Sequence, residues 1–274
     1  MINFLRELEQ RDSSLYYFGW VCLLLAVAFI VLSRITHVRV KGVNAWYKPV
    51  KFSLSIFIYS WTMAWLVYYL PGFNQRAYNE TSVILLGFEI FYIALQAGRG
   101  QMSHYNASTK LYSFLFALMG LAASAVTLYT AYIGVLFFHD DVVALPTYYL
   151  WSIRLGIILF VVFAFEGALM GSRQSHTIGA ADGADAGLPF LNWSKKFGDA
   201  RVAHFVGMHA LQVLPLLSLY VLKNVSLTIL VGLLYAFLAT FTLVQALKGR
   251  PLVRERKSEV VPVGGFQPAD GSLN

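Results

Sequence analysis

Charged residues and cysteine are both scarce in this sequence. Asp, Glu, Lys and Arg make up 13% of the 274 residues, whereas hydrophobic residues make up 58% and aromatic residues 16%. Soluble domains carry roughly 25% charged residues, so this composition excludes an ordinary soluble globule. The single cysteine, Cys22, lies in the first apolar run. An internal disulfide and a metal site built from cysteines are therefore excluded.

Several motifs that would indicate a chemistry are also missing. The sequence has no CxxCH haem-attachment motif and no HExxH or HxxxH pair. Any haem or metal site would therefore depend on histidine, methionine or carboxylate side chains. The first residues mix acids with bases and lack the basic start and small-residue cleavage site of a secretory signal. We expect a short amphipathic segment followed by a first span that is retained.

Long apolar runs dominate the rest of the sequence. A helix needs about 20 apolar residues to cross the hydrocarbon of a bilayer. Seven runs qualify, at about 15–33, 50–70, 81–98, 110–138, 147–170, 200–222 and 225–247. They predict an all-α polytopic membrane protein with seven transmembrane helices. We expect residues 1–248 to form a single transmembrane domain, and residues 249–274, rich in Gly, Pro and charge, to form a disordered basic tail.

The basic residues are divided unequally between the two sets of loops. Sixteen Lys and Arg residues lie in segments 33–52, 99–110 and 171–201 and in the tail, and four lie in the opposite set. This predicts an outside N-terminus and a cytoplasmic C-terminus in a multi-pass protein of the cell inner membrane. The net charge of +7 is then a topology signal and does not indicate nucleic-acid binding. The expected partners are the lipid bilayer and anionic lipid at the basic cytoplasmic face, and a homo-oligomer is left open.

Polar residues inside the spans follow the helical period of about 100° per residue. In the sixth run they share one arc of the helix, formed by Arg201, His204, His209 and Gln212. If the third helix continues past Gly98, it carries a stripe of Glu89, Tyr92, Gln96 and Ser103. The fifth run adds Glu166 and Arg173, and the second run adds Lys48, Lys51, Ser55, Tyr59 and Thr62, with Asn44 at its uncertain start.

These stripes predict a polar site inside the bundle. A charged side chain at the bilayer centre costs at least ~2.5 kcal/mol, so Glu89, the deepest acid, should face other helices and have a partner there. We expect a water-accessible cavity that opens to the cytoplasm between the second, third, fifth and sixth spans. The candidate polar or catalytic residues are Glu89, Glu166, Arg99 and Arg173. The candidate cofactor ligands are His104, His176, His204 and His209.

Structural roles are the alternative for each of these residues. Arginines near the interface can extend their guanidinium groups to the lipid headgroups, and histidines near helix ends can serve as caps. The two glutamates can act as hydrogen-bond partners between helices. These roles explain poorly why His, Arg, Glu and Gln gather on inward stripes of one leaflet.

Two functions fit the pattern, and a structural or sensory role is the third. In the first, His204 or His209 pairs with His104 or His176 to ligate haem b, with an arginine on the propionates. A variant uses a divalent metal held by three histidines and a carboxylate for membrane redox or lipid chemistry. In the second, the chain is a transporter or channel for a small anionic or protonatable solute. The number of histidines on one side of the membrane favours the cofactor, while the sequence leaves open whether the chain is an enzyme.

Overall fold

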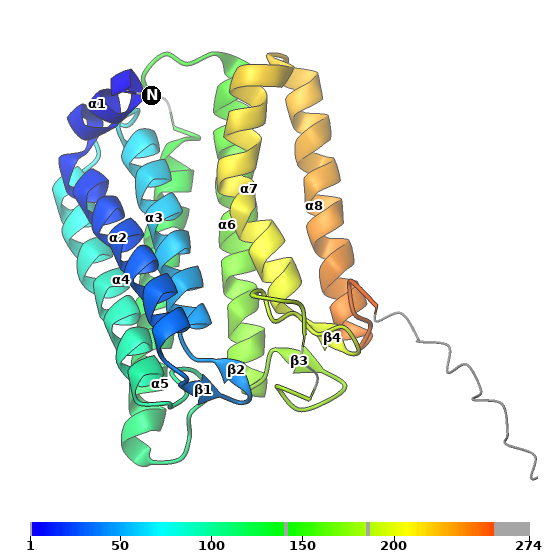
Figure 1. The fold of residues 1–274 in the computed structure, drawn as a ribbon. Helices are drawn as coiled ribbons and strands as arrows, with labels where there is room; N and C mark the ends of the chain where they lie inside the picture. Colours follow the sequence, from blue (N-terminus) through cyan, green and yellow to red (C-terminus); the bar gives the residue numbers. More distant parts are fainter. Residues whose placement is uncertain (1, 140–141, 185–186, 255–274) are drawn as a thin grey trace, which may run out of the picture.

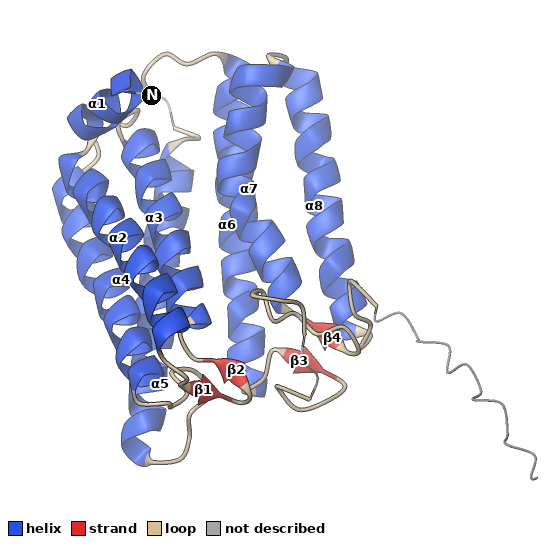
Figure 2. Cartoon of the chain, viewed as in Figure 1, coloured by secondary structure: helices blue, strands red, loops and turns tan. Residues whose placement is uncertain are grey.

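The fold is an all-α bundle, and it confirms the seven predicted spans. The computed structural model describes residues 2–139, 142–184 and 187–254, and within these ranges seven helices are long and apolar enough to cross a membrane. The helices are α1 (Ile2–Arg11), α2 (Ser13–Ile35), α3 (Tyr47–Val67), α4 (Gln75–Gly98), α5 (Lys110–Leu136), α6 (Thr147–Arg173), α7 (Arg201–Leu217) and α8 (Val225–Leu247). A π-helical turn, η1 (Ser218–Leu222), extends α7. The short strands are β1 (Arg39–Val40), β2 (Val43–Asn44), β3 (Thr177–Ile178) and β4 (Gly198–Asp199), drawn in red in Figure 2.

The amphipathic segment expected before the first span is the helix α1. It lies at one end of the bundle, beside the start of α2 (Figure 1). Its Leu8 is fully buried, and the guanidinium of Arg11 lies 3.7 Å from the ring centroid of Trp65 on α3. Asp12 then begins α2, because its carboxylate accepts a hydrogen bond of 3.0 Å from the backbone N–H of Leu15.

The transmembrane helices form two groups. α2, α3 and α4 lie together, α6, α7 and α8 lie together, and α5 contacts both α4 and α6 (Figure 1). Glycines allow close packing within each group, as small residues do in membranes. A Cβ added to Gly19 would lie 2.3 Å from the ring of Trp61, and one added to Gly207 would lie 2.0 Å from the ring of Phe163. α2 therefore packs tightly on α3, and α7 packs tightly on α6.

The strands mark the end of the bundle opposite α1, which we call the strand-bearing end (Figure 1). β1 pairs with β2 and β3 pairs with β4, each in antiparallel register. Lys41 and Gly42 connect β1 to β2 with φ values of 48° and 78°, as a type I′ hairpin turn requires. β4 approaches the last turn of α8 closely, because a Cβ on Gly198 would lie 1.9 Å from the carbonyl oxygen of Ala246. The segments rich in Lys and Arg lie at this end of the bundle. That this end faces the cytoplasm stays a prediction.

The structure corrects the limits of two predicted polar stripes. α4 ends at Gly98, and Gly100 has a φ of +66°, so Ser103 is not part of this helix. Asn44 lies in β2 and not on α3, and its amide donates to the carbonyl of Ser33. Pro49 lies in the first turn of α3, as its missing N–H allows. Most of the predicted disordered tail, residues 255–274, lies outside the described residues.

Candidate functional site

A cavity of about 170 Å³ lies between the two groups of helices. It is lined by α6 and α7 on one side and by α3, α4 and α5 on the other, so α5 joins the four spans that were predicted. Its polar lining residues are Ser55, Tyr59, Glu89, Thr127, His204, His209 and Gln212. An apolar cavity of ~150 Å³ is known to hold benzene, so a cavity of this size suits a small solute and is too small for haem.

Glu89 on α4 is the acidic group of the cavity. It is 7% exposed, and it makes no hydrogen bond or ion pair with any residue that the structure describes. A buried, unpaired carboxylate costs several kcal/mol, so Glu89 favours a hydrogen-bond donor or a bound proton. The deepest acid therefore lies in the cavity wall as an acceptor, but the partner that the sequence predicted for it is not found among the described residues.

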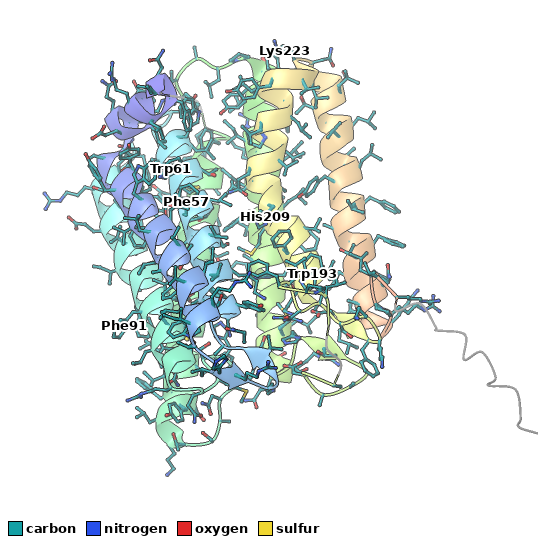
Figure 3. The ribbon with its side chains drawn as sticks, in the orientation of Figure 1. Phe57, Trp61, Phe91, Trp193, His209 and Lys223 are labelled. Atoms are coloured by element: carbon teal, nitrogen blue, oxygen red, sulfur yellow. The ribbon has the colours of Figure 1, made fainter. Side chains whose placement is uncertain are left out.

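The two histidines of α7 present acceptors in their neutral forms. The Nδ1 atom of His204 lies 2.7 Å from the carbonyl oxygen of Phe163, and the Nδ1 atom of His209 lies 2.7 Å from that of Phe205. A carbonyl oxygen only accepts, so each Nδ1 carries the proton and each Nε2 keeps its lone pair. Figure 3 shows His209 on α7, farther from the strand-bearing end than Trp193.

Hydrogen bonds link the helices on the α1 side of the cavity. The Tyr59 hydroxyl lies 2.8 Å from the Tyr78 hydroxyl and 2.7 Å from the Thr130 hydroxyl, which ties α3 to α4 and α5. The side-chain amide of Gln212 donates to the Thr62 hydroxyl at 3.1 Å, which ties α7 to α3. The hydrogen bond between Gln212 and Thr62 therefore connects the two helix groups.

Glu166 on α6 and His204 on α7 are two candidate residues that the fold brings together, although the sequence did not predict them as a pair. The Glu166 Oε2 atom lies 3.4 Å from the His204 Nδ1 atom, and the Glu166 side chain is 5% exposed. Neither carboxylate oxygen has a hydrogen-bond partner among the described residues. The adjacent Gly167 makes room for the ring, since a Cβ there would lie 3.1 Å from the imidazole of His204.

A second polar network lies at the strand-bearing end, where β4 leads into α7. The Arg201 guanidinium binds the Asp199 carboxylate through two hydrogen bonds, of 2.9 Å from Nε and 2.6 Å from Nη2. Such a forked pair has a fixed geometry as well as a strong charge interaction. The Asp199 carboxylate also accepts 3.0 Å and 3.1 Å hydrogen bonds from the backbone N–H groups of Ser194 and Arg201. The Asp199 carboxylate is therefore fixed by an ion pair and by two backbone N–H groups, and the N-cap position of α7 is Ala200.

His176 and Asp182 extend this network beneath α6. The Nδ1 atom of His176 lies 3.4 Å from Asp182 Oδ1 and 3.9 Å from Asp199 Oδ1. Burial and the charge of Arg201 lower the pKa of His176 to about 4, although both carboxylates act in the opposite direction. Burial alone would raise the pKa of Asp182. The nearby His176 and the hydrogen bonds that Asp182 accepts from Ser175 and Thr177 hold this pKa below its usual value. The imidazole is therefore neutral and the Asp182 carboxylate ionised near pH 7.

Two lysines at the start of α3 face this end. Lys51 donates a 3.1 Å hydrogen bond to the carbonyl of Leu191, in the segment between β3 and β4. Lys48 makes no hydrogen bond or ion pair with the described part of the chain. Its Nζ atom lies 5.7 Å from the ring centroid of Phe52, and Phe52 lines the cavity. Lys48 is therefore a basic group without a hydrogen bond or ion pair among the described residues, next to the cavity wall.

His104 and Tyr105 lie in the loop after α4, close to Phe52 and to His176. The His104 ring lies 5.5 Å from the Phe52 ring, and the Tyr105 ring lies 6.2 Å from His104 and 6.4 Å from His176. Burial, reinforced by the positive charge of Lys48, lowers the pKa of His104 well below its usual value. His104 is therefore a neutral neighbour of Lys48.

The four predicted ligand histidines do not gather around one space. His204 and His209 line the cavity, whereas His104 and His176 lie at the strand-bearing end in contact with Tyr105. Within residues 2–139, 142–184 and 187–254 no group of three or more His, Cys, Asp or Glu residues could hold a metal ion. This geometry does not support the metal variant of the sequence hypothesis.

The two predicted arginines lie away from the cavity. Arg99 follows the last residue of α4 and Arg173 is the last residue of α6, and both are exposed. Their proposed role beside haem propionates gains no support from these positions. The catalytic and ligand roles assigned from the sequence stay predictions.

Sequence reasoning missed Asp182 and Tyr105. Asp182 lies in a linker of small residues, where no periodicity distinguishes it from a solvated acid. Tyr105 lies in a loop and has a φ of 56°, so helical spacing could not relate it to His104 or His176. Only the tertiary fold brings these side chains together.

No protein-family model, no curated protein and no solved structure matches the chain. Its function is therefore inferred from the chemistry of the cavity and of the strand-bearing end.

Proposed function

We propose that the chain is a membrane transporter that binds a small protonatable solute in the cavity between its two helix groups. The observation that carries this proposal is Glu89, a buried carboxyl that lines the cavity and has no partner among the described residues. Ionisable groups inside a membrane domain are costly and commonly mark solute or proton pathways. An ammonium or similar donor would compensate the Glu89 charge.

The other polar groups of the cavity favour the same class of solute. In their neutral forms, His204 and His209 each offer an Nε2 acceptor, because their Nδ1 atoms donate to backbone carbonyls. Gln212 directs its amide nitrogen to Thr62, which leaves its carbonyl oxygen as an acceptor. An excess of acceptors suits a solute that donates hydrogen bonds, and it disfavours the anionic solute that the sequence also allowed.

The arrangement of the helices supports transport. Solute sites of many transporters lie between two parts of the bundle that move relative to each other. Here the cavity lies between two helix groups, which are tied together by the bond of Gln212 to Thr62 on one side and by that of Lys51 to Leu191 on the other. Both bonds can break and re-form without disturbing the packing inside either group.

Uptake into proteoliposomes tests the proposal. The purified full chain is reconstituted and offered radiolabelled glycine, alanine and guanidine as probes. We expect protein-dependent uptake of at least one probe and a loss of about 10-fold or more in Glu89→Gln, because a charged hydrogen bond contributes ~1.5 to 3 kcal/mol. The matched control is Glu80→Gln, which removes an exposed carboxylate from the same helix.

The outcomes separate transport from the cofactor hypothesis. If no probe is taken up, or if Glu89→Gln transports as well as the wild type, the proposal is wrong. A visible spectrum of the detergent-purified protein, with metal analysis, is the companion measurement. A Soret band that disappears in His204→Ala or His209→Ala would favour the His-ligated haem instead.

A further inference from the structure

An unpaired acid lies in the wall of the cavity, and an unpaired base lies beside that wall on the strand-bearing side. Glu89 lies in the wall, and Lys48 lies beside Phe52, which is also part of the wall. Neither charge has a hydrogen bond or ion pair within the described residues, although each lies in the electrostatic field of the other. A space with an unpaired acid in its wall and an unpaired base beside that wall is complementary to a molecule that carries both charges.

Helical spacing places Lys48 on the cavity side of α3. Residues four, seven and eleven positions apart share one face of a helix. Phe52, Ser55 and Tyr59 stand at these distances after Lys48, and all three line the cavity. The Lys48 side chain therefore continues the same face by one turn toward the strand-bearing end.

The position of Lys48 in its own helix favours a bound anion. Lys48 lies in the first turn of α3, where the helix macrodipole is positive and a cation is unfavourable. The nearby acids do not neutralise it, because Asp182 is held by Ser175 and Thr177, and Asp199 by Arg201. A carboxylate at this point would compensate both the lysine and the helix end.

We propose that the cavity binds a small zwitterion of the α-amino acid class, with its ammonium on Glu89 and its carboxylate on Lys48. This inference rests on the proposed function and names the substrate class of the same site. The volume of about 170 Å³ limits the solute to a few carbon atoms. The apolar lining, which includes Phe52, Leu86 and Val126, accommodates a short aliphatic side chain.

Three related probes, alanine and its analogues without one charged group, test the assignment of each charge. Alanine carries both charges, ethylamine lacks the carboxylate and propionate lacks the ammonium. Binding to the detergent-purified full chain is measured by equilibrium dialysis with radiolabelled probes. We expect alanine to bind about 10-fold or more tightly than either of the others, as one charged contact fewer implies.

Variants then assign each contact. Lys48→Met should weaken alanine binding to the level of ethylamine and leave ethylamine binding unchanged. Glu89→Gln should weaken alanine and ethylamine alike. Lys48→Arg keeps the charge and should keep the preference for alanine, which separates a lost contact from a folding defect.

The outcomes distinguish this inference from the proposed function. If ethylamine binds as tightly as alanine and still requires Glu89, the protonatable solute stands and the zwitterion is wrong. If Lys48→Met weakens both probes equally, Lys48 does not contact the carboxylate and the assignment fails. If none of the three probes binds, both proposals are overturned.

Discussion

His176 makes the protein sensitive to mild acid. Its pKa is lowered to about 4 in the folded chain, first by burial and then by Arg201 and Lys48, against the opposing charges of Asp199 and Asp182. An unfolded histidine titrates near pH ~6.5. Between these values the unfolded chain binds a proton that the folded chain does not bind, so stability falls as the pH falls.

The two pKa values set the size of the effect. Over the interval from pH ~7 to pH ~5, the proton linkage of one such histidine removes about 2 kcal/mol of unfolding free energy. The stability that comes from keeping His176 neutral is fully present above the pKa of the unfolded histidine. It is lost as the pH decreases toward 4. Asp182 does not contribute to the change in stability over this pH interval. Its pKa lies below its usual value, so it titrates only in stronger acid.

Thermal unfolding of the detergent-solubilised protein at the two pH values measures the effect. His176→Gln keeps a neutral polar side chain, so its melting temperature should decrease less between pH ~7 and pH ~5 than that of the wild type. The matched control is His37→Gln, which removes an exposed imidazole. If His176→Gln keeps the full acid sensitivity of the wild type, the burial argument for this residue is wrong.

Two further predictions concern packing and topology. Gly207→Ala should destabilise the contact of α6 with α7 by about 1 to 3 kcal/mol, because the new Cβ overlaps a ring on α6, whereas Gly120→Ala adds its Cβ in open space and should not lower the melting temperature. An unchanged melting temperature in Gly207→Ala would contradict the close approach of these helices. In a cysteine-free background, an impermeant thiol reagent added to intact cells should label Arg76→Cys and not Ala107→Cys, because the excess of Lys and Arg places the strand-bearing end inside. The reverse pattern would invert the topology.

The sequence predicted the spans and one wall of the site, because both depend on local periodicity. The length of each apolar run determines where a helix can cross a bilayer. The angular positions of His204, His209 and Gln212 follow from the helical repeat, and all three line one cavity. Glu89 was expected to face the bundle because lipid exposure is too costly, and it is buried in the cavity wall.

Contacts between polar side chains at the strand-bearing end could not be predicted in the same way. His176 and Asp182 are close in sequence, but their contact depends on the turn after α6 and on β3. Arg99 and Arg173 resemble Arg201 in their position near a helix end, yet only Arg201 has an acid two residues before it that folds back onto its guanidinium. The acid at this spacing is visible in the sequence, but its contact with the guanidinium depends on the backbone geometry where β4 meets α7.

The segment between β3 and β4 links the two helix groups at the strand-bearing end of the cavity. Lys51 of α3 donates to the carbonyl of Leu191, and Arg201 of α7 donates to the carbonyl of Asn192, so consecutive peptide groups hold the two helix groups at a fixed spacing. A motion that separates α3 from α7 at this end would pull on both of these bonds. If the cavity binds the solute proposed above, weakening either bond should speed its entry and its departure together, with little change in the occupancy at equilibrium. The residence time of that solute, and not its affinity, is then what variants of Lys51 should change.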